Sequence, residues 1–284
     1  MVKGRGTAYW TGVMSLTGAM EIKAVKKAER TILSHCYYEG ALKLTRPVYL
    51  DENAPSVYMI HVGGGYVDGD VYTTQIQAAR EAELSVTTQS HTKVYKTPKK
   101  PVVQKTSIHM EENSLVEYMP DPLIAYEQAR FVQETDVHMK EGARLIYSDM
   151  MTPGWAEDGR SFSYDWIRSM LKVYKNERLV VFDHLFLEPD ESISGLMQME
   201  GYSHTGMLLV LHDSVDEKFI NIVYERLNTM NLEARFGISE LPVKGFMLRI
   251  LAHSTKTLEE LIYKAHDYIR SNLLHRENIQ WRKY

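Results

Sequence analysis

The chain has 284 residues, of which 44% are hydrophobic and 25% charged, so it has the composition of an ordinary globular protein with a sizeable core. Its formal net charge of −4 argues against a dedicated nucleic-acid-binding protein, which is usually basic. The single cysteine, Cys36, excludes an intramolecular disulfide and a cysteine-based zinc site.

Nothing in the sequence predicts export or a membrane span. The first residues, MVKGRGTAYWTGV, contain no apolar signal-peptide core, and no run of about 18 apolar residues occurs. One cysteine in a chain of this length also fits a reducing compartment. We therefore expect a cytoplasmic protein.

Taken in chain order, short runs rich in Val, Ile, Thr and Tyr lie between turn signals as far as about residue 210, which predicts β-strands. No convincing repeat, low-complexity tract or proline-rich linker divides the chain, so we expect one domain over residues 1–284. The runs are TILSHCYY (31–38), ALKLTRPVYL (41–50), SVYMIHV (56–62), ELSVTTQS (83–90), SLVEYMP (114–120), ARLIYSDM (143–150), MLKVYK (170–175) and RLVVFDHLFL (178–187).

Two short segments predict how strands are connected. Asn176-Glu177 joins the last two runs and suits a tight hairpin turn. The Gly-containing segment 140–142 is predicted to turn VQETDVHM back into ARLIYSDM.

Two amphipathic helices are predicted near the C-terminus. The first starts at Ser214 with Glu217 three residues later, and the second at Thr257 with Glu260 three residues later; both are capping-box patterns. Apolar residues then recur at a spacing of three to four. The fold class predicted is mainly β: a large multi-strand β-sheet framework, layered or sandwich-like, flanked by two α-helices in the C-terminal half.

The stretch HVGGGYVDGD (61–70) raises the question of a phosphate or metal site. Gly63 and Gly65 fit the start of a dinucleotide fingerprint, but its third position holds Asp68, and the next residues resemble a strand rather than a helix. A phosphate loop is therefore excluded. A tight turn, or a turn that aims Asp68 and Asp70 at a cavity or cation path, stays open; with His61 they offer nitrogen and oxygen donors to a divalent ion.

Other segments carry weaker signals. No G-x-S-x-G elbow, HExxH motif or linked catalytic spacing occurs, so we expect no enzyme, with an unrecognised hydrolase or transferase site as the alternative.

The lysines of KVYKTPKKPVVQK (93–105) could contact RNA, but a solvated loop or a patch for an acidic protein fits the net charge better. The segment 117–131, EYMPDPLIAYEQARF, is either core packing or a partner surface. Its candidate partner-binding residues are Tyr118, Asp121, Pro122 and Arg130.

Three segments together resemble the urease accessory protein UreD family, called UreH in some bacteria. They are HVGGGYVDGD, LSVTTQSHTKVYK and VEYMPDPLIAYEQARF, and DMMTPGWAEDGRSFSYDW is similar to the family's next Gly/Arg-containing segment. Their order and spacing match over about residues 30 to 275. Residues 1–28 resemble the family less, and His91 stands where the family more often has a small residue.

The resemblance implies a non-catalytic scaffold for urease maturation. Such a protein would bind UreF, recruit the GTPase UreG, dock on the urease apoprotein and help Ni²⁺ reach the buried active site. It would contact neither nucleic acid nor membrane and hold no tightly bound cofactor, only transient Ni²⁺. The family's mostly β fold with an internal water-filled tunnel implies tunnel acids at Asp68, Asp70 and Asp149. A β-rich adaptor with no metal role stays open.

Overall fold

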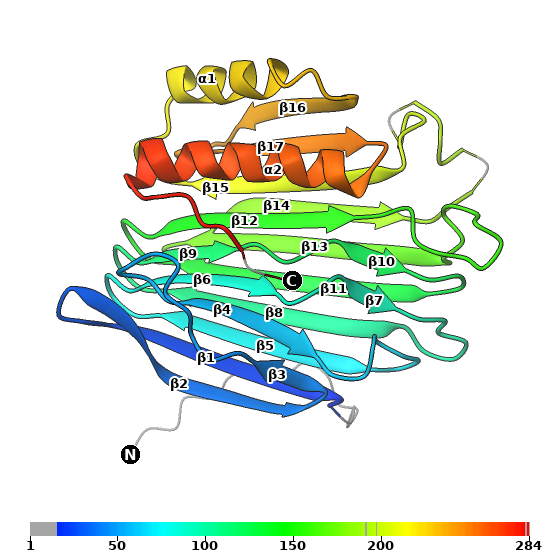
Figure 1. The fold of residues 1–284 in the computed structure, drawn as a ribbon, viewed down its shortest axis with the longest axis horizontal. Helices are drawn as coiled ribbons and strands as arrows, with labels where there is room; N and C mark the ends of the chain where they lie inside the picture. Colours follow the sequence, from blue (N-terminus) through cyan, green and yellow to red (C-terminus); the bar gives the residue numbers. More distant parts are fainter. Residues whose placement is uncertain (1–15, 191, 197, 282, 284) are drawn as a thin grey trace.

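The computed structural model describes residues 16–190, 192–196, 198–281 and 283, and it consists of two β-sheets with a layer of helices on one of them (Figure 1). The seven-stranded sheet has the order β14 (Arg178–Leu187), β13 (Trp166–Lys175), β11 (Arg130–Met139), β8 (Val102–Met110), β5 (Val71–Ala78), β1 (Gly18–Lys27) and β2 (Arg30–Gly40).

The ten-stranded sheet packs against it. Its path is β16 (Ala234–Glu240), β17 (Gly245–Ala252), β15 (His204–Leu211), β12 (Arg144–Met151), β9 (Leu115–Tyr118), β6 (Glu83–Thr88), β4 (Ser56–His61) and β3 (Leu42–Leu44). Off this path, β10 (Leu123–Ala125) pairs with β12, and β7 (Thr92–Val94) pairs with β10. The helices are α1 (Glu217–Asn228) and α2 (Thr255–Ile269), and α2 runs on into a π-helical turn, η1 (Arg270–Leu274). The mainly β fold class with two helices in the C-terminal half is confirmed.

The central part of the chain is a solenoid, because successive strands alternate between the two sheets. Strands β4, β6, β9 and β12 pair in parallel in one sheet, and β5, β8, β11 and β13 in the other. Each crossover that a parallel pair requires is therefore made by a strand of the opposite sheet rather than by a helix. Val57 pairs with Val86, and Gln104 with Gln133, each 29 positions further along the chain.

This architecture corrects two expectations. The absence of a repeat was wrong: residues 103–110 (VQKTSIHM) and 132–139 (VQETDVHM) share five identical positions and lie side by side in β8 and β11. The segment 140–142 makes no hairpin, since β11 and β12 belong to different sheets. The hairpin at Asn176-Glu177 is confirmed between β13 and β14, with positive φ at both residues.

Two apolar cores hold the layers together. The larger fills the space between the sheets, and the smaller lies between the ten-stranded sheet and the helices. In Figure 1, α2 lies across β15 and β17. Both helices start at other residues than expected. The side chain of Asp216 caps α1 by accepting a hydrogen bond from the backbone N–H of Phe219, and the side chain of Ser254 caps α2 by accepting one from the backbone N–H of Thr257. Each cap satisfies an amide that the helix leaves without a partner.

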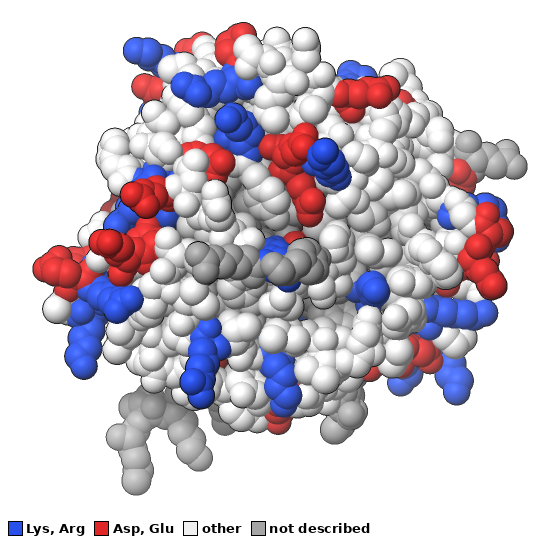
Figure 2. Space-filling model, in the orientation of Figure 1, with Lys and Arg blue, Asp and Glu red and all other residues white. Residues whose placement is uncertain are grey.

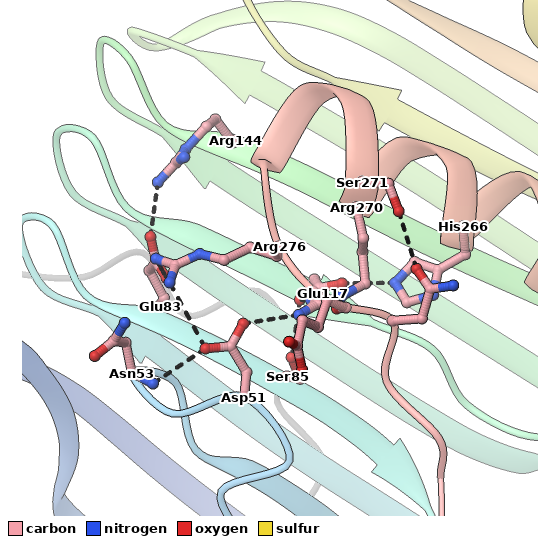
Figure 3. A network of polar contacts seen from close by, with 12 residues as sticks. Asp51, Asn53, Glu83, Ser85, Glu117, Arg144, His266, Arg270, Ser271 and Arg276 are labelled. Carbon is pink, nitrogen blue, oxygen red and sulfur yellow. Dashed lines mark hydrogen bonds and ion pairs between the residues drawn. The ribbon is translucent and has the colours of Figure 1, made fainter.

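The outer face of β6 and β9 is polar yet buried, because the chain after η1 covers it. Glu117 of β9 accepts a hydrogen bond from Nε2 of His266 at 2.6 Å and one from Arg270, and Arg270 also pairs with Asp51 at 2.8 Å. Figure 3 shows this network between α2 and the sheet. Arg276 extends it by bonding Glu83 at 2.7 Å. The network therefore fixes the C-terminal segment on the sheet through paired charges.

The surface carries mixed charge. On the face shown in Figure 2, acidic and basic side chains are interspersed and form no large field of one sign. Lys105, part of the lysine-rich segment, lies in β8 rather than in a loop, and it forms an ion pair with Glu134. No helix in the described ranges is long and apolar enough to cross a membrane.

Candidate functional site: a polar passage between the sheets

A cavity of about 340 Å³ lies between the two sheets. Its walls come from inward-facing positions of successive solenoid strands and from the loops at one end of them. The polar side chains that line it include Thr74, Gln104, Tyr118, Gln133, Thr135, Tyr147 and Asp149.

The parallel register explains why this cavity is polar. Residues at equivalent positions of successive coils stack, so Gln104 lies beside Gln133 and Gln133 beside Ser169. Further along the same strands the stacked residues are apolar, as in the row of Ile76, Ile108 and Val137, all fully buried. The interior between the sheets is thus packed core in one part, and in another part it is a cavity with several polar side chains in its wall.

Asp149 is a partly buried carboxylate in the wall of this cavity. It accepts hydrogen bonds at 2.9 Å from the hydroxyl of Ser169 and at 2.9 Å from the side-chain amide of Gln133. Burial raises its pKa to about 6, although both hydrogen bonds act in the opposite direction. Near neutral pH this carboxylate is therefore held in a poorly solvated place, where a cation would be attracted to it.

Asp149 also lines a second, smaller cavity of about 40 Å³. Asp183 of β14 and Arg249 of β17 line that cavity too, and they form an ion pair. Asp149 therefore lines both cavities, whereas the Asp183–Arg249 pair lines only the smaller one. Sequence reasoning missed Asp183, because it comes from a hairpin strand whose register with β13 had to be known first.

Asp68 does not line the cavity. Its carboxylate accepts hydrogen bonds from the backbone N–H groups of Lys99 at 2.8 Å and Lys100 at 2.9 Å. These hydrogen bonds lower the pKa of Asp68. Gly63, Gly64 and Gly69 have positive φ, which glycine adopts without a steric penalty. The glycine-rich stretch is thus a tight turn whose first aspartate ties it to the neighbouring loop.

Asp70 is buried beside the cavity rather than in its wall. Its carboxylate accepts hydrogen bonds from Oγ1 of Thr17 at 3.0 Å, from the amide of Val67 at 2.7 Å and from Oη of Tyr72 at 2.8 Å. Tyr72 and His61 do line the cavity, and they lie 3.0 Å apart between Oη and Nε2. Asp70 can therefore act on the interior only through these two side chains.

The four candidate partner-binding residues lie mostly inside the fold. Tyr118, Asp121 and Pro122 are buried, and Asp121 forms an ion pair with Lys283. Arg130 is half-buried, and its Nε donates to the carbonyl of Thr97 at 2.9 Å. Their role in binding a partner stays a prediction, and the structure shows them as parts of the cavity rim and of the loop that supports it.

The geometry defines a class of protein: a β-solenoid with a cavity between its sheets, several polar side chains in the wall of that cavity, and a helical layer on one sheet. The family model of the UreD urease accessory protein matches residues 16–283, and the chain belongs to this family.

Curated relatives agree along the whole length. The chain is 55% identical to the urease accessory protein UreD of Bacillus sp. (strain TB-90), with 95% of this chain and 100% of the relative covered. It is 42% identical to the UreD of Lachnoclostridium phytofermentans, covering 94% and 98%, and 37% identical to that of Bacillus cereus, covering 95% and 99%. The match includes β1, which lies in the part of the sequence that resembled the family less.

Proposed function

We propose that this protein is a urease maturation factor that works as a non-catalytic scaffold. In this proposal it binds UreF, recruits the GTPase UreG through UreF, and docks on the urease apoprotein. Ni²⁺ then moves through the passage between the sheets toward the urease active site. Family membership supports the role in urease maturation, and the observation that carries the nickel path is Asp149, a carboxylate that lines both cavities.

The chemistry of the wall suits a passage better than a storage site. Amide, hydroxyl and carboxylate oxygens can replace part of the water shell of a divalent ion. Among the described residues, no three His, Cys, Asp or Glu side chains lie together in a way that could hold a metal. An ion would therefore be bound weakly at each point and released to the next, which transport requires.

The test is urease activation in cells that express Asp149→Asn in place of the wild-type chain. We expect activation to fall at least ~10-fold, because the amide keeps the shape of the side chain and removes the charge that attracts the cation. Pull-down of UreF, UreG and urease is measured in the same cells and should be unchanged.

The matched control is Asp68→Asn, which alters a carboxylate outside the cavity and should activate normally. Normal activation by Asp149→Asn would reject the nickel path and leave a scaffold without a metal role. Loss of UreF binding by Asp149→Asn would instead show that the residue acts in assembly.

A further inference from the structure

A stripe of exposed apolar side chains crosses one end of the solenoid. Its members are Val67, Tyr95, Tyr126 and Trp155, one from each of four successive coils. Val67 is 51% and Trp155 52% exposed, and the two tyrosines between them are partly exposed. The cavity wall contains none of these four side chains, so the stripe is a separate feature of the surface.

The parallel register brings the four side chains into one line. Tyr95 directly follows β7 and Tyr126 directly follows β10, and these two strands pair in parallel. Tyr126 forms an isolated β-bridge with Trp155. Val67 comes one residue after a position that bridges the last residue of β7. The line therefore runs across the coils, and the ends of β7 and β10 mark its place in Figure 1.

The rings of the stripe hold one another in place. The ring centroids of Tyr95 and Tyr126 lie 4.7 Å apart with a tilt of 60°, and those of Tyr126 and Trp155 lie 5.0 Å apart with a tilt of 42°. Oη of Tyr95 also donates to the carbonyl of Gly64 at 3.3 Å. The stripe is therefore formed before a partner arrives, so little side-chain entropy is lost on binding.

Lysines lie beside one end of the stripe. Lys96 directly follows Tyr95, and the carboxylate of Asp68 holds the backbone N–H groups of Lys99 and Lys100. All three lysines are exposed, and none forms an ion pair with a carboxylate among the residues that the structure describes. This end of the stripe therefore carries more positive than negative charge.

The opposite end of the stripe carries carboxylates. Glu127 directly follows Tyr126, and Asp158 comes shortly after Trp155. Arg160 bonds both of these carboxylates, and its Nη2 lies 3.1 Å from Oε1 of Glu127. The charge along the stripe therefore changes from basic to acidic, with the aromatic rings between.

We propose that this stripe docks an extended segment of a partner protein, in which acidic residues meet the lysines and adjoining apolar residues pack on the rings. The stripe is one side chain wide, which suits a single extended chain that presents alternate side chains to one surface. Aromatic rows of this kind also bind proline-containing segments. The proposal concerns the outside of the protein and does not depend on the nickel path.

A nucleic acid fits this surface less well. It carries phosphates along its whole length, so the carboxylates of Glu127 and Asp158 would repel the part that reaches Trp155. The rings also contact one another at a tilt instead of standing apart as open platforms for bases. A protein segment avoids both difficulties, because its negative charge can be confined to one part.

The experiment measures binding of a fluorescent synthetic peptide to the full chain by anisotropy. The probe joins a block of glutamates to a block of alternating proline and tyrosine. It is compared with the same peptide carrying lysines in place of the glutamates, and with an oligouridylate of matching length. We expect only the acidic peptide to bind, with an affinity that falls as salt is added.

Two variants test the two parts of the stripe. Trp155→Ala should weaken binding of the acidic peptide at least ~10-fold, because it removes an exposed apolar contact. The triple variant Lys96→Glu, Lys99→Glu, Lys100→Glu should weaken it by at least ~10-fold as well, because it reverses the charge beside the rings.

The matched control is Tyr37→Ala, which removes an exposed ring on the edge strand β2 and should bind the acidic peptide as the wild type does. Equal binding of the acidic and lysine peptides, an unchanged affinity in Trp155→Ala, or an equal loss in Tyr37→Ala would overturn the proposal. Tighter binding of the oligouridylate would replace the protein segment by a nucleic acid. A loss in the lysine variant alone would show charge attraction without the stripe, and would reject docking on the rings.

Discussion

At the scale of single residues, Asp149 combines two properties that are usually separate: it is partly withdrawn from solvent between the sheets, yet it has hydrogen-bond donors that favour its charged form. Burial prevails, so the folded protein holds the proton more tightly than the unfolded chain does. A charge kept in the interior at a cost to stability is a common mark of a functional site.

This cost predicts a pH dependence for Asp149→Asn. The folded pKa is about 6 and the ordinary value is 3.8, so ionisation lowers the stability of the wild type as the pH rises from about 4 to 6. The variant avoids that loss. We expect it to be more stable than the wild type by about 3 kcal/mol at pH 7.5 and nearly equal in stability at pH 4, as measured by urea unfolding.

Asp68→Asn should behave in the opposite sense, because hydrogen bonds lower the pKa of Asp68 in the folded state. Its variant should lose stability at neutral pH and match the wild type in acid. An Asp149→Asn variant that is less stable than the wild type at pH 7.5 would show that the charge is compensated in the fold.

How far the sequence predicts the site depends on the residue. The resemblance implies Asp149 as a tunnel acid; the residue lines the cavity between the sheets, and its part in a nickel path stays a prediction. The sequence could not show that Asp68 and Asp70 have different surroundings. The Asp68 carboxylate binds the backbone of a distant loop, and the Asp70 carboxylate binds Tyr72. Asp183 reaches the passage only through strand pairing that spacing does not reveal.

At the scale of elements, the sequence pattern that β8 and β11 share could have predicted that these two strands lie side by side. Their shared pattern V-Q-x-T-x-x-H-M places glutamine and threonine on the inner face at the same depth in each coil. Individual strands were predictable from local composition, whereas their sheet was not, since parallel pairing joins segments about 30 residues apart. The hairpin at Asn176 was predictable because its turn is local.

The attachment of α2 to β9 yields a second prediction. Burial alone would raise the pKa of Glu117, but the hydrogen bond from His266 and the charge of Arg270 lower it to about 2. Glu117→Gln leaves the buried Arg270 with only part of its compensation, and we expect a loss of about 3 kcal/mol at pH 7 in urea unfolding.

The loss should depend on pH in a defined direction. A depressed carboxylate pKa stabilises the fold above the unfolded value of about 4.5, and this contribution disappears as the pH falls toward 2. Glu225→Gln, on the exposed face of α1, is the control and should leave stability within about 0.5 kcal/mol. Equal stabilities for Glu117→Gln and the wild type at pH 7 would contradict this account.

At the scale of the whole molecule, the two sheets end in edge strands, and the edge strand β14 exposes two phenylalanine rings. Phe182 and Phe186 of β14 are 59% and 48% exposed, and Phe186 lies 6.3 Å from the ring of Trp166 between centroids. Exposed apolar patches of this kind commonly mark protein interaction sites. A scaffold that binds UreF, as proposed above, needs such a surface.

We therefore expect the double variant Phe182→Ser, Phe186→Ser to bind UreF at least ~10-fold more weakly, which can be measured by interferometry with purified proteins. The pair Tyr37→Ser, Tyr38→Ser on β2, at the opposite edge of the same sheet, is the matched control. Reduced binding in the β2 control alone would move the interface to that edge.

If nickel follows the proposed path, the solenoid also determines how far the ion travels. The wall is built from equivalent positions of β5, β8, β11 and β13, so the path runs across the strands, and each coil adds about one inter-strand spacing, ~4.8 Å. Gain or loss of one coil of roughly 30 residues would lengthen or shorten this path by one such spacing. The bore would stay the same, because every coil contributes the same pair of facing positions.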